Sequence, residues 1–158
     1  ACVAVYPMYQ GVSRLVGMDI IETTSHDTPA DEFQRVVDNW DKYDFFFIHF
    51  KKTDSTGEDG DYEAKVAATE ALDEVAARVA DVGPDVLLVT GDHSTPSCMA
   101  MHSWHPVPVL LKAEHARVDA VTAFGESQCA TGSLGTVRAM DLMALMLAHA
   151  GRLQKFGA

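Results

Sequence analysis

An acidic and an imidazole side chain, Asp92 and His93, are adjacent in the sequence. With Gly91 before them, they come directly after an apolar run at residues 85–90. Both side chains can face one divalent ion if the chain turns at the end of a strand. A carboxylate with an imidazole suits manganese, zinc or iron, and magnesium is also possible. The alternative is that Asp92 caps a helix and His93 is incidental. This pair alone leaves the two interpretations equally open.

A second acidic stretch follows the apolar run at residues 44–50. Asp54 and Glu58 lie four residues apart there, on either side of a glycine, and could reach one cation. The alternative is a solvated acidic loop, because the charge run continues beyond Glu58. Taken alone, this stretch favours the solvated loop.

Imidazoles also occur at His102 and His105, just before Pro106 and Pro108. The prolines favour an extended backbone leading into the next strand. A single histidine is more often a surface or core residue than a ligand. Together, however, the three polar stretches supply two to three carboxylates and two imidazoles, and this combination favours a metal site.

The elements that must position these residues alternate between strand and helix patterns. We expect strands at residues 3–6, 18–21, 44–50, 85–90 and 106–111. The runs at 44–50 and 85–90 do not alternate with polar residues, which is typical of strands buried on both faces. We expect helices at residues 31–41, 61–80 and 134–150, and loops at 51–61, 91–105 and most of 112–133.

Two helices carry further signals. Thr28 supplies a capping hydroxyl and Pro29 suits the first helical position, so the first helix should begin there. The helix at residues 134–150 is apolar nearly all round and should be largely buried.

Strands alternating with helices predict the α/β class, as a three-layer sandwich with a mainly parallel central sheet. We expect residues 1–158 to form a single domain. Ligands of such folds bind beyond the carboxyl ends of the strands. The polar stretches 51–61 and 91–105 each follow such an end, so we expect them at the same edge of the sheet.

Composition narrows the classes of partner. The 158 residues carry a net charge of -11, which argues against nucleic-acid binding because the phosphate backbone would be repelled. A phosphorylated substrate remains compatible if bound metals supply positive charge. No apolar run reaches the roughly 18–20 residues that cross a bilayer. Three widely spaced cysteines indicate a reducing, cytoplasmic compartment.

Longer motifs connect these stretches. Val-Thr-Gly-Asp-His-Ser-Thr-Pro at residues 89–96 and His-Ser-x-x-Pro-Val-Pro at 102–108 resemble the alkaline phosphatase superfamily. Ile-His-Phe-Lys-Lys-Thr-Asp at 48–54 and Gly-Asp-Tyr-Glu-Ala-Lys at 60–65 resemble more closely the archaeal-type, cofactor-independent phosphoglycerate mutases. Residues 11–18 and 126–135 also match, so the likeness covers nearly the whole chain.

This resemblance implies an alkaline phosphatase-like fold and an isomerase of glycolysis. Such enzymes interconvert 3- and 2-phosphoglycerate through a phosphoserine, with two divalent ions (manganese, magnesium or zinc). The resemblance further implies that Asp92 and His93 bind one ion, and that Asp54 and His102 bind the other. Glu58 stands where many relatives have histidine, and a carboxylate there favours harder metals.

The resemblance also implies which residues are not ligands and which elements of the family this chain lacks. His105 falls where many relatives have asparagine or aspartate, so it is not placed among the ligands. Nothing before Asp54 matches the family's first metal-binding aspartate, its nucleophilic serine or its inserted substrate domain. We therefore expect this chain to be the C-terminal metal-binding portion of a larger enzyme, inactive alone, with catalytic and substrate-binding residues unassigned.

Two other functions stay open. The first is another phosphotransferase or phosphatase of the same superfamily, because the metal loops are shared across it. The second is a non-catalytic module with a decayed metal site. In the favoured interpretation the partner is a small phosphorylated molecule, with no nucleic acid and no membrane, and the oligomeric state is open.

Overall fold

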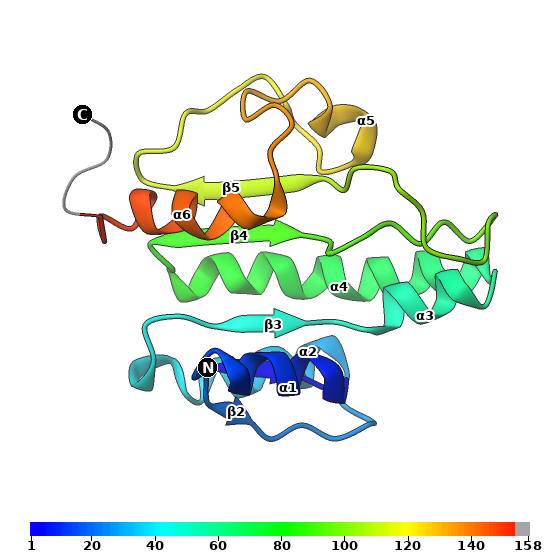
Figure 1. Cartoon of the computed structure of the whole chain (residues 1–158), viewed down its shortest axis with the longest axis horizontal. Coiled ribbons are helices and arrows are strands. Elements are labelled where there is room, and N and C mark those ends of the chain that lie inside the picture. The colour runs from blue at the N-terminus through cyan, green and yellow to red at the C-terminus, as the bar shows by residue number, and fades with distance from the viewer. Residues whose placement is uncertain (154–158) are drawn as a thin grey trace. The chain divides into compact units, whose positions relative to one another are not determined.

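The computed structural model describes residues 1–153, which belong to two compact units (Figure 1). The first unit comprises Ala1–Val82 and Thr95–Met101. The second comprises Gly83–Ser94 and the chain from His102 onward. The chain therefore passes from the second unit into the first after Ser94, and returns at His102.

The first unit is built on a three-stranded parallel sheet. Its strands are β1 (Cys2–Ala4), β2 (Ile20–Ile21) and β3 (Phe47–His49), in the order β2-β1-β3. Strand β1 is fully buried and central, whereas β3 lies at an edge of this sheet and is half-buried. The expectation that residues 44–50 form a strand buried on both faces is therefore wrong for this sheet. The apolar run also supplies residues beside the strand that pack on the core, such as Phe46 and Phe50.

Helices of the first unit are α1 (Pro7–Leu15), α2 (Pro29–Val37), α3 (Lys52–Glu58) and α4 (Tyr62–Val82), with a 3-10 turn at Trp40–Lys42. The core is a cluster of Val3, Phe33, Val36 and Val75, contributed by β1, α2 and α4. The buried face of α2, with Phe33 and Val36, therefore forms part of this core.

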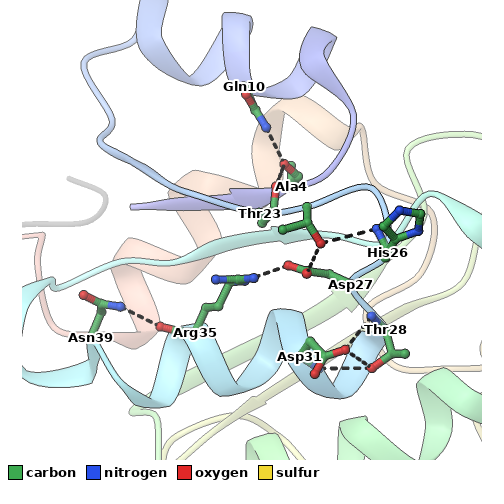
Figure 2. Close-up of polar contacts among 10 residues, drawn as sticks. Ala4, Gln10, Thr23, His26, Asp27, Thr28, Asp31, Arg35 and Asn39 are labelled. Carbon is green, nitrogen blue, oxygen red and sulfur yellow. Dashed lines mark hydrogen bonds and ion pairs between the residues drawn. The ribbon is translucent and has the colours of Figure 1, made fainter.

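The start of α2 follows the sequence signals. Thr28 accepts the backbone N–H of Asp31 at 3.2 Å, and Asp31 accepts the backbone N–H of Thr28 at 2.8 Å (Figure 2). This reciprocal capping box satisfies two helix-end donors. Pro29 occupies the first turn, as expected. The sequence prediction for this helix start is confirmed.

The expected loop at residues 51–61 is wrong, since most of it forms α3. The Thr56 hydroxyl donates to the Lys52 carbonyl at 2.9 Å, and Lys65 of α4 donates to the Thr53 carbonyl at 2.7 Å. A seven-residue polar helix is marginal by itself. Contacts with α4 supply the stability that the local sequence does not.

The second unit contains β4 (Val86–Thr90) and β5 (Val109–Ala113), which pair antiparallel with Thr90 opposite Val109. A short helix α5 (Glu126–Cys129) follows, and α6 (Ala139–His149) lies alongside the strand pair (Figure 1). The expectation of a largely buried final helix is wrong. Within α6 only Leu142 is buried, and Met140 is 75% exposed.

The α/β class predicted from the sequence is confirmed, with three parallel strands and one antiparallel pair. Within residues 1–153, none of the helices is both long and apolar enough to cross a bilayer.

Candidate metal centre

Asp54 lies in the first turn of α3, directly after β3. Its Oδ1 accepts a short hydrogen bond from the Thr95 hydroxyl, and its Oδ2 forms a close ion pair with the Lys51 ammonium. The Asp54 side chain is only 13% exposed. The fold therefore holds this carboxylate in a fixed orientation in the first unit.

Glu58 lies one helical turn after Asp54 on α3, so the two carboxylates share a face. The Lys51 ammonium lies 3.7 Å from Glu58 Oε2, and 46% of the Glu58 side chain is exposed. The same ammonium lies 5.0 Å from the centre of the Tyr6 ring. The hydrogen bond to Asp54 and the two nearby carboxylates raise the pKa of Lys51, so this group carries a full positive charge.

Gly57 explains why Thr95 comes so close to α3. A Cβ at this position would collide with the Thr95 carbonyl oxygen, and would also press on Lys65 Nζ at 3.0 Å. Glycine thus permits the backbone of Thr95 to pack directly on the helix. That packing places the Thr95 hydroxyl on Asp54.

Asp92, His93 and His102 belong to the second unit. His93 Nε2 lies 3.6 Å from Asp92 Oδ2, and the rings of His93 and His102 lie with their centroids 3.9 Å apart. The Ser103 N–H donates to the Ser94 carbonyl at 2.9 Å and closes the loop between the two histidines. The structure thus brings both predicted imidazoles together.

His105 is engaged elsewhere in the second unit. Its Nδ1 lies 2.9 Å from the Ser103 hydroxyl oxygen, and its ring stacks on Trp104 at 5.1 Å between centroids. The His105 ring is thus held by its neighbours Ser103 and Trp104. An open cavity of about 1070 Å³ within this unit is lined by residues including Asp92, His93 and His105. Asp92 and His93 are therefore accessible to a ligand.

The donor chemistry of these groups fits divalent cations. Carboxylate oxygens suit magnesium and manganese, and imidazoles suit manganese, iron and zinc. The hydrogen bond from Thr95 orients the Asp54 carboxylate, as groups around a metal site commonly orient its ligands. Sequence reasoning did not identify Thr95. Its hydroxyl donates a hydrogen bond to Asp54, which is 41 positions away, and the residues next to Thr95 give no sign of this contact.

Comparisons with known proteins agree with this chemistry. A family model described as Metalloenzyme superfamily matches residues 1–149. A protein of Thermotoga sp. strain RQ2 is 52% identical over 156 residues, covering 99% of this chain and 38% of that protein. A protein of Thermus thermophilus is 48% identical over 159 residues, covering 100% of this chain and 39% of that protein. Both are named "Probable 2,3-bisphosphoglycerate-independent phosphoglycerate mutase".

A solved structure, titled "Structure of PH0037 protein from Pyrococcus horikoshii", matches with a TM-score of 0.91 and 32% identity. The match covers 99% of this chain and 50% of that one. The family resemblance drawn from the motifs is confirmed, and the chain spans about two-fifths of the length of the named relatives.

Proposed function

Since this chain belongs to the Metalloenzyme superfamily, we propose that it supplies the metal-binding part of a cofactor-independent phosphoglycerate mutase. The names of the relatives support this activity, and the substrate would be 3- or 2-phosphoglycerate. The activity is proposed for the longer protein, because the chain spans only about two-fifths of its relatives. In this proposal residues 1–158 form one metal-binding domain and act in the cytoplasm.

The proposed ligands are Asp54 and Glu58 on α3 together with Asp92, His93 and His102. One observation carries the proposal: the residue that hydrogen-bonds Asp54, Thr95, follows His93 by only two positions in the chain. A short peptide thus connects a proposed imidazole ligand to the partner of a proposed carboxylate ligand. The Glu58 carboxylate favours manganese or magnesium over zinc.

Divalent ions held by these groups would supply positive charge next to a phosphoryl group. The chain itself has a net charge of -11 and would otherwise repel a phosphorylated substrate. Thr95 fixes the Asp54 carboxylate, and the loop closed by Ser94 and Ser103 holds the two imidazoles. This chain thus orients ligands, while we assign it no nucleophile and expect no phosphoglycerate turnover from it alone.

A manganese titration tests the proposal. The metal-free chain should bind two manganese ions by calorimetry, and its melting temperature should rise. For each ion, saturation at about 100 times its dissociation constant adds about 2.7 kcal/mol to the free energy of unfolding. Asp92→Asn should remove most of this gain. Asp85→Asn, at an exposed position before β4, is the matched control and should not.

A chain that shows neither heat of binding nor thermal stabilisation with manganese or magnesium contradicts the proposal. That result would favour a module whose metal site has decayed. A phosphoglycerate turnover by the isolated 158 residues would contradict the second part, the assignment of catalysis to the longer protein.

A further inference from the structure

The Lys51 ammonium contacts both α3 carboxylates that are proposed to bind a metal ion. It forms the close ion pair with Asp54 Oδ2 and lies 3.7 Å from Glu58 Oε2. We propose that Lys51 is an internal counter-ion, which holds the Asp54 and Glu58 carboxylates until a divalent cation displaces it. This inference rests on the proposed metal centre and adds a residue that controls its loading.

The first argument is the set of partners of Asp54. Thr95 donates to Oδ1 and Lys51 to Oδ2, so both oxygens already accept from groups of the chain. Asp54 is only 13% exposed, and a carboxylate with so little solvent is costly without a compensating charge. The Lys51 ammonium therefore stabilises the metal-free chain.

The second argument is the position of Lys51 along the chain. It immediately precedes α3, with Asp54 three residues later and Glu58 seven residues later, so one ammonium serves both helical turns. A divalent ion bound by the same two carboxylates would be strongly repelled by an ammonium at this distance. Retention of the Lys51 contacts therefore opposes binding of the metal, and loss of these contacts favours it.

The third argument is that the Lys51 ammonium has a second partner, the ring of Tyr6. Its ammonium already lies 5.0 Å from the centre of the Tyr6 ring, where a cation is attracted to the aromatic face. The lysine stem is flexible, and 30% of the side chain is exposed. Displacement therefore needs a side-chain rotation and no refolding of α3.

The test is a manganese titration of three metal-free chains by calorimetry, with their melting temperatures measured before metal is added. Lys51→Met keeps the apolar stem and removes the charge. Lys52→Met removes the same charge from the adjacent, exposed position and controls for net charge. Lys51→Met should tighten manganese binding by about tenfold and lower the metal-free melting temperature. Lys52→Met should resemble the wild-type chain in both measurements.

Lys51→Arg provides a second variant that keeps the charge and the fold. The guanidinium holds carboxylates with two parallel hydrogen bonds, so manganese binding should weaken by several-fold. Manganese affinity that is equal in wild type, Lys51→Met and Lys51→Arg overturns the inference and leaves the proposed function intact. Weaker binding by Lys51→Met also overturns it, because Lys51 would then help to build the site. No manganese binding by any variant overturns both proposals.

Discussion

The imidazole rings of His93 and His102 lie with their centroids 3.9 Å apart and their planes inclined by 34°. The backbone explains this closeness, because Ser94 and Ser103, each one residue further on, are joined by a hydrogen bond of 2.9 Å. Two imidazoles are thus presented together by the ends of one loop. The two imidazoles proposed for the metal centre therefore lie next to each other.

His102→Ala should weaken manganese binding by at least about tenfold, because it removes one imidazole ligand while leaving the Ser94–Ser103 hydrogen bond in place. Calorimetry of the metal-free chain measures the change. His105→Ala is the matched control, since the contacts of His105 are with Ser103 and Trp104. Equal losses in the two variants would show that general loop packing, and not ligation by His102, supports binding.

Gly57→Ala should destabilise the chain by about 1–3 kcal/mol, because the new methyl group collides with the Thr95 carbonyl oxygen. Chemical denaturation measures the free energy of unfolding. The same substitution at Gly11, inside α1 and with no neighbour within 4 Å of the added methyl, should be neutral or stabilising by about 0.5–1 kcal/mol.

The Gly57 variant also bears on the site. Since the collision would move Thr95 away from α3, manganese affinity should fall together with stability. A Gly57→Ala chain as stable as the wild type would contradict the close packing of Thr95 on α3.

Sequence reasoning succeeded where the determining interactions are local. The capping hydroxyl of Thr28 and the proline at position 29 are adjacent signals, and the structure confirms both. The long helix α4 was also predicted nearly to its ends, because a helix of 21 residues carries its own periodic signal. The end of β4 at Thr90, two residues before Asp92, was likewise predicted from the sequence.

Sequence reasoning failed where contacts between residues distant in the chain determine the structure. Helix α3 is short, polar and contains Gly57, so its sequence resembles a loop. Thr95 and Lys65 pack on it from positions distant in the chain. Helix α1 was also missed, and its apolar residues Met8, Val12 and Leu15 are exposed in the structure. The pairing of Thr95 with Asp54 spans 41 positions and has no signal in either local sequence.

Thr28→Ala should lower the free energy of unfolding by about 1 kcal/mol, because α2 loses the side-chain half of its capping box. Thr122→Ala, at an exposed position outside any helix or strand, is the control and should change it by less than about 0.5 kcal/mol. Chemical denaturation of both variants measures the difference. A loss equal to that of the control would mean that Pro29 and the Asp31 carboxylate alone suffice to start α2.

The last prediction concerns Glu32, which is buried in α2 with 4% of its surface exposed. Among the described residues its Oε2 has no hydrogen-bond partner. Burial raises the pKa of Glu32 to about 8, with the nearby Asp27 charge adding to the rise and Arg35 opposing it. Arg35 itself is hydrogen-bonded to Asp27 at 2.7 Å and holds the pKa of Asp27 down to about 2 (Figure 2).

A carboxyl whose pKa is raised on folding retains its proton in the folded chain after the unfolded chain has lost it. The folded chain then binds more protons, so stability falls as pH rises from about 4.5 to about 8. Glu32→Gln cannot ionise and should escape this loss. Its advantage over the wild type should be small near pH 5 and should reach roughly 3 kcal/mol near pH 7.

Urea denaturation of both chains at several pH values measures this advantage. Glu70→Gln makes the same chemical change at an exposed position on α4, and its difference from the wild type should not vary with pH. A Glu32→Gln advantage that stays constant from pH 5 to pH 8 would show that the variant acts through packing, and that Glu32 ionises normally in the folded chain. A growing advantage would instead identify Glu32 as a group that weakens α2 and its core contacts as pH rises.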